Sequence, residues 1–108
     1  MLFFFVVVGS GVCANETIFT VKYDGGFLEV SSTEKPDTFI VKDESGVLWG
    51  IVASNGLLYS TNGYTKTKYE KTDLGIYYEN TKLEKGYIPD DSPLYALLKQ
   101  LFSVCYDH

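Results

Sequence analysis

The sequence predicts an α+β domain: an antiparallel β-meander of about six or seven short strands, curled into a half-barrel or barrel, with one C-terminal helix packed on it. Two observations predict this fold. From residue 17 to about residue 80, short runs rich in Thr, Val, Ile, Phe and Tyr alternate with turn residues, a pattern typical of antiparallel hairpins. After residue 92, apolar residues recur at the spacing of one helix face.

Seven runs are candidate strands, and turn residues separate them. Asp-Gly at 24–25 and Asn-Gly at 55–56 and 62–63 favour two-residue hairpin turns, because these residues tolerate positive φ. Pro36 fixes a further turn. The predicted strands are residues 17–23, 27–33, 38–43, 47–53, 57–61, 64–71 and 74–80.

The C-terminal segment predicts a helix over residues 93–106. Ser92 suits the N-cap, because its hydroxyl can accept a hydrogen bond from a backbone amide of the first turn, and Pro93 suits the first helical position. One face is apolar along its whole length. Its members are Leu94, Leu97, Leu98, Leu101, Phe102 and Cys105. The place of Cys105 on this face favours a buried, inert thiol over an intermolecular disulfide.

The N-terminal stretch FFFVVVGSGVCAN permits several interpretations. Gly9, Gly11 and Ala14 fit G-x-G-x-x-A, but strand-like residues follow where a dinucleotide-binding fold needs a helix. The apolar run is too short for a membrane span. Val12 and Ala14 suit the −3 and −1 positions of an export signal, although no Lys or Arg precedes the run. We therefore predict that residues 1–14 are a signal peptide and that residues 15–108 form a secreted domain; a buried first strand is the alternative.

The charge balance argues against nucleic acid as a partner. The formal net charge is −5, and all nine basic residues are Lys. An acidic surface repels phosphate backbones and anionic lipid, and the bidentate fork of Arg is missing. Lys66, Lys68 and Lys71 form a local basic cluster, which is typical of a solvated strand face.

No residue pattern indicates catalysis, a metal or a cofactor. The single histidine, His108, is the last residue, where chains fray. The carboxylate pairs at 43–44 and 90–91 fall in a turn and before a helix, where both have structural explanations. The sequence therefore predicts a non-enzymatic protein, and a small hydrolase is the lesser alternative.

The segment from residue 49 to 69 is the candidate binding surface. Tyr59, Tyr64 and Tyr69 lie beside Asn- and Gly-containing turns, and this mixture of Tyr, Ser, Gly and Asn is typical of recognition surfaces. The competing explanation is the high β propensity of Tyr. Trp49 stands in the most apolar run, which predicts a place in the core. We expect a module that binds a protein partner, of inhibitor, immunity or effector type; the alternative is a small barrel that carries a hydrophobic ligand.

The prediction for residues 1–14 can be tested by intact-mass spectrometry of the protein recovered from the medium of a secreting host. We expect a mass that begins at Asn15, because signal peptidase cleaves after a small residue such as Ala14. An Ala14→Gln variant should block this cleavage and serves as the control. A secreted protein that begins at Met1 would contradict the prediction.

Overall fold

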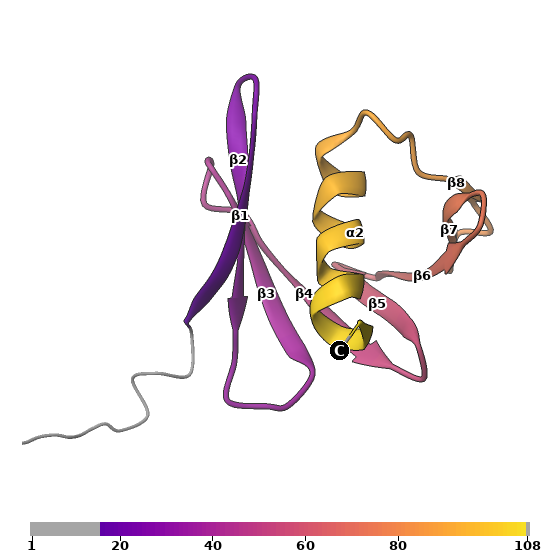
Figure 1. Cartoon of the computed structure of the whole chain (residues 1–108), viewed down its shortest axis with the longest axis horizontal. Helices are drawn as coiled ribbons and strands as arrows, with labels where there is room; N and C mark the ends of the chain where they lie inside the picture. The colour runs from indigo at the N-terminus through magenta and orange to yellow at the C-terminus, as the bar shows by residue number, and fades with distance from the viewer. Residues whose placement is uncertain (1–15, 108) are drawn as a thin grey trace, which may run out of the picture.

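The computed structural model describes residues 16–107, and all element bounds refer to this range. Within residues 16–107 there are eight strands and one helix, labelled as in Figure 1. The elements are β1 (Thr17–Tyr23), β2 (Gly26–Ser32), β3 (Thr38–Asp43), β4 (Leu48–Ser54), β5 (Leu57–Asn62), β6 (Thr65–Thr72), β7 (Gly75–Asn80), β8 (Lys85–Tyr87) and α2 (Pro93–Tyr106). The helix has the bounds that the sequence predicts.

The eight strands form one antiparallel sheet, in which every strand pairs with its neighbours in the sequence. The sheet is an open half-barrel rather than a closed barrel, because β1 and β8 lie at opposite edges. It bends around α2, so that β1–β3 and β5–β8 lie on either side of the helix (Figure 1). The predicted α+β meander with a packed C-terminal helix is confirmed, and β8 is an additional strand beyond the seven predicted runs.

The strand β8 follows a turn built by the side chain of Asn80. Its Oδ1 accepts hydrogen bonds from the backbone N–H groups of Lys82 (3.0 Å) and Glu84 (3.1 Å). Its amide nitrogen donates to Oε1 of Glu84 at 3.0 Å. An Asn side chain that binds the following backbone in this way replaces a backbone turn. The chain thereby returns to the sheet, where Tyr87 pairs with Tyr77.

The core lies between α2 and the face of the sheet that turns toward it, which we call the concave face. Leu97, Leu98 and Leu101 of the helix are fully buried, as their three- and four-residue spacing predicts. Five strands supply the fully buried residues that complete the core. These are Val30, Val41, Ile51, Leu58 and Ile76. Burying one such side chain contributes about 1.5–3 kcal/mol to stability, so this contact holds the helix on the sheet.

Glu44 connects two neighbouring hairpins. Its Oε1 accepts hydrogen bonds from the Tyr23 hydroxyl (2.8 Å) and from the backbone N–H of Phe27 (3.1 Å). The first of these bonds is the main cause that raises the pKa of Tyr23. A Cβ at Gly26 would overlap the Glu44 carboxylate, so a larger residue there would displace this side chain from its hydrogen bonds.

The predictions for residues 1–14, including the signal peptide and export, fall outside the described residues and stay predictions. Between residues 16 and 107, the structure contains no helix of the length and apolar character that crossing a membrane requires.

The helix start provides a test of the fold. Ser92 Oγ accepts a hydrogen bond from Tyr95 N at 3.2 Å and donates one to the Pro89 carbonyl at 2.7 Å. Because Ser92→Ala removes the cap, we expect it to lower the free energy of unfolding by about 1 kcal/mol, measured by urea denaturation. Ser92→Asp should retain most of the stability. Ser103→Ala, on the exposed face of the same helix, should be neutral or slightly stabilising; an equal loss in both Ala variants would contradict this assignment.

Candidate functional site

The concave face changes from apolar to polar along one row of paired residues. Phe39 of β3 pairs with Ile51 of β4, which pairs with Ser60 of β5 and then with Thr67 of β6. Residues that pair directly in a sheet point to the same side, so all four point toward α2. The small polar side chains at the β5–β6 end do not fill the space below the first turn of the helix.

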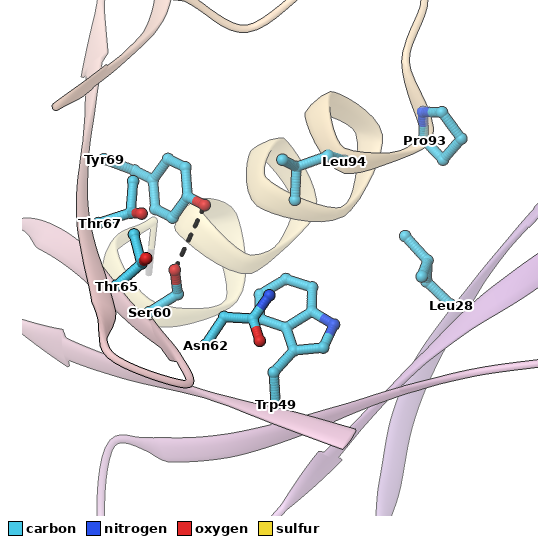
Figure 2. Close-up of a pocket in the computed structure, with 9 residues that line it drawn as sticks. All are labelled: Leu28, Trp49, Ser60, Asn62, Thr65, Thr67, Tyr69, Pro93 and Leu94. Carbon is cyan, nitrogen blue, oxygen red and sulfur yellow. Dashed lines mark hydrogen bonds between the residues drawn. The ribbon is translucent and has the colours of Figure 1, made fainter. Parts of the chain in front are cut away.

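A cavity of about 520 Å³ lies at this place, open to solvent (Figure 2). We call it the Trp49 groove. Strands β5 and β6 supply its polar side: Ser60, Asn62, Thr65, Thr67 and Tyr69. Strands β2 and β4 and the start of α2 supply its apolar side: Leu28, Trp49, Pro93 and Leu94. Trp49 is therefore a half-buried residue that lines a groove as well as packing against the core.

Several polar groups of the groove are available to a ligand. The side chains of Trp49, Asn62, Thr65 and Thr67 form no hydrogen bond with another residue in the range 16–107. In the same range, no buried side-chain nitrogen or oxygen lacks a hydrogen-bond partner. The polar atoms of these four side chains are thus open to solvent, where they can exchange water for a ligand.

Tyr69 occupies a different environment from these four residues. Its side chain is only 6% exposed, and its hydroxyl accepts a hydrogen bond from Ser60 Oγ at 3.3 Å (Figure 2). The Tyr69 ring therefore forms a fixed part of the groove, and its polar end already has a partner. No Asp, Glu, Lys, His or Cys is among the described residues that line this groove, so its surface is uncharged.

A second cavity, of about 370 Å³, continues from the Trp49 groove past the start of α2. Thr67, Tyr69 and Leu94 line both cavities. Tyr78 of β7 and Ile88, which follows β8, line only the second one. The two cavities together form an open trough that crosses β6 and β7 below the first turn of the helix.

The three predicted binding residues do not share one surface. Tyr59 pairs with Lys68, whereas Tyr69 pairs with Leu58, so Tyr59 and Tyr69 point to opposite faces of the sheet. Tyr59 is 37% exposed on the outer face, and Tyr64 is 103% exposed at the tip of the β5–β6 turn. The structure thus brings Tyr69 into the Trp49 groove and leaves Tyr59 and Tyr64 on the outside.

The outer face carries further exposed aromatic and apolar side chains. Val52, which is 44% exposed, pairs directly with Tyr59. The rings of Tyr77 and Tyr87 meet edge to face, with their centroids 5.4 Å apart. Beside Tyr59, Lys68 of β6 pairs with Glu79 of β7. This face therefore offers two small apolar patches with charges between them.

The other chemically distinctive residues have structural roles or lie elsewhere. Asp43 Oδ1 accepts hydrogen bonds from the backbone N–H groups of Ser45 (2.8 Å) and Val47 (3.0 Å), which shapes the β3–β4 turn. Cys105 is half-buried on α2, and burial raises the pKa of its thiol. No group of three or more His, Cys, Asp or Glu residues in the range 16–107 is placed to hold a metal ion. His108 falls outside the described residues.

Sequence reasoning missed the groove as a site. A signal for it exists in β5 and β6, where Ser60 and Thr67 alternate with outward residues and share a face with the buried Leu58 and Tyr69. Small polar residues on the face that carries the core indicate a place where the core is incomplete. The folded structure is needed to show that Trp49 and Leu94 meet them there.

In comparisons with known proteins, no family model, no curated protein and no solved structure matches the chain.

Proposed function

We propose that this chain is a non-enzymatic binding module whose ligand lies in the Trp49 groove. The observation that carries the proposal is the set of solvent-open hydrogen-bonding groups beside a half-buried indole, in a cavity of about 520 Å³. Sites for small ligands are typically clefts of roughly 300–1,000 Å³, lined by apolar and aromatic side chains with a few polar groups that fix orientation. The Trp49 groove has this size and this mixture.

The lining favours binding over chemistry. Acid–base catalysis needs a titratable side chain within hydrogen-bond reach of the substrate. Tyr69 is the single titratable residue among the described residues that line the groove, and its hydroxyl is hydrogen-bonded to Ser60. The groove can therefore hold and orient a ligand, which is the activity that we assign to it.

The polar side of the groove also restricts the ligand. An apolar ligand would cover Asn62, Thr65 and Thr67 without giving them hydrogen bonds, at a cost of about 1–3 kcal/mol for each buried group. A ligand with both an apolar part and hydrogen-bonding groups avoids this cost. The proposal therefore differs from carriage of a purely hydrophobic ligand in a closed barrel.

The outer face favours a second candidate function, the recognition of a protein partner. Tyr59 and Val52 form one exposed patch, and Tyr64 projects from the adjacent turn. Tyr supplies large contact area at low entropic cost, and aromatic residues are enriched at protein interfaces. Tyr59 and Val52 lie on the face opposite to the groove, so this patch and the groove do not compete for the same surface.

The groove proposal is testable with N-phenyl-1-naphthylamine, a neutral fluorescent probe that has aromatic rings and one N–H group. We expect its emission to rise on binding the wild-type protein. Thr65→Phe should weaken binding at least about tenfold, because the larger ring fills the groove. Thr61→Phe places the same ring on the outer face of β5 and should leave the affinity unchanged.

Melting temperatures of both variants show whether they are folded. If Thr65→Phe binds the probe as tightly as the wild type, the site lies elsewhere. Failure of the folded wild-type protein to bind the probe at all would overturn the proposal.

The second candidate calls for affinity capture from the native host fluid, with mass spectrometry of the captured proteins. Tyr59→Ala and Tyr64→Ala should each reduce capture of the partner about tenfold or more, because exposed Tyr residues at interfaces are often hot spots. Leu83→Ala is the matched control, since Leu83 is also an exposed apolar residue at a turn. Equal capture by all four proteins would contradict a role for these tyrosines.

A further inference from the structure

We infer that the ligand of the Trp49 groove is a neutral carbohydrate chain, with one sugar ring against Trp49 and its hydroxyl groups on Asn62, Thr65 and Thr67. This inference rests on the proposed function of the groove and names the chemical class of its ligand. Three properties of the site lead to it: an aromatic surface, a row of polar groups open to solvent, and the absence of charge among the described lining residues.

The aromatic surface comes from Trp49. Its side chain lies between the polar side of the groove and Leu28 (Figure 2), and it is half-buried, so part of it stays accessible. The face of an aromatic ring carries partial negative charge and attracts the partly positive hydrogens of C–H groups. A pyranose ring presents C–H groups on its face, which suits this surface.

The polar groups lie on the opposite side of the groove from Leu28 (Figure 2). The hydroxyls of Thr65 and Thr67 and the amide of Asn62 have no hydrogen-bond partner among residues 16–107. Hydroxyls and amides can both donate and accept, as can the hydroxyls at the edge of a sugar ring. A sugar can thus satisfy both sides of the groove at once, which an aliphatic chain or a flat hydrocarbon cannot do.

The charge of the ligand follows from the lining. Neither a carboxylate nor a lysine is among the described residues of the groove, so a charged ligand would lose its hydration without gaining a partner. The net charge of the protein, −5, further disfavours anionic ligands. A neutral sugar meets no such penalty.

The second cavity indicates a chain rather than a single sugar. It continues from the Trp49 groove through the shared residues Thr67, Tyr69 and Leu94, and Tyr78 provides a further aromatic ring there. A further unit of the same sugar chain can lie against Tyr78 when one unit lies against Trp49. Affinity should therefore increase from monosaccharides to short oligosaccharides.

The experiment measures displacement of N-phenyl-1-naphthylamine by glucose, galactose, mannose and N-acetylglucosamine and by their short oligomers. Calorimetric titration and the emission of Trp49, the single tryptophan of the sequence, provide independent readouts. We expect one oligomer series to displace the probe, with oligomers binding about tenfold more tightly than the monosaccharide.

Three variants test the assigned contacts. Thr67→Val, which removes one hydroxyl at nearly constant shape, should weaken sugar binding about fivefold to tenfold. The same change should strengthen probe binding, because the largely apolar probe covers this hydroxyl without a hydrogen bond. Thr61→Val, on the outer face, is the matched control and should change neither. Tyr78→Leu should abolish the gain from a longer oligomer and retain the affinity for the monosaccharide.

The outcomes separate this inference from the proposed function. If the probe binds but no neutral sugar displaces it, the carbohydrate assignment is wrong and the groove remains a ligand site. Displacement by acidic sugars or by uncharged peptides alone also overturns the assignment, as does an equal effect of Thr67→Val on sugar and probe. If the wild-type protein binds neither probe nor sugar, both proposals fail.

Discussion

The packing of one helix into the concave face of the sheet is the interaction on which the rest of this structure depends. A sheet must bury its apolar face against another layer, and here α2 supplies that layer. Leu97, Leu98 and Leu101 are fully buried against it. The helix contacts β1 and β7, near the two ends of the sheet, so it connects strands that do not pair with each other.

The groove exists because the close packing of α2 on the sheet does not extend to the first turn of the helix. The buried stripe of α2 extends from Leu97 to Phe102, and Leu94 in the first turn is only half-buried. Below that turn, the concave face carries Ser60 and Thr67 in the same cross-strand row that has Phe39 and Ile51 nearer to β3. Short polar side chains leave open the space that larger apolar ones would fill.

Local signals explain which features the sequence predicts. The helix bounds depend on Ser92, on Pro93 and on the spacing of the leucines, all within 15 consecutive residues. Strand β8 has no such signal, because it is three residues long and forms only after the Asn80 side chain turns the chain. The register between β5 and β6 decides on which face of the sheet Tyr59 and Tyr69 lie. Their position in the sequence, beside an Asn-Gly turn, does not reveal this register.

The openness of the sheet is the condition for an accessible groove. Eight strands are enough to close a small barrel whose interior is filled by side chains, and closure would remove the trough. Because α2 lies between β1–β3 and β5–β8 (Figure 1), it keeps the two edges apart. Exposed edges carry a risk of pairing with other chains. Among the described strands β1 and β8 are the edges, and Lys22 on β1 and Lys85 on β8 disfavour pairing with another chain there.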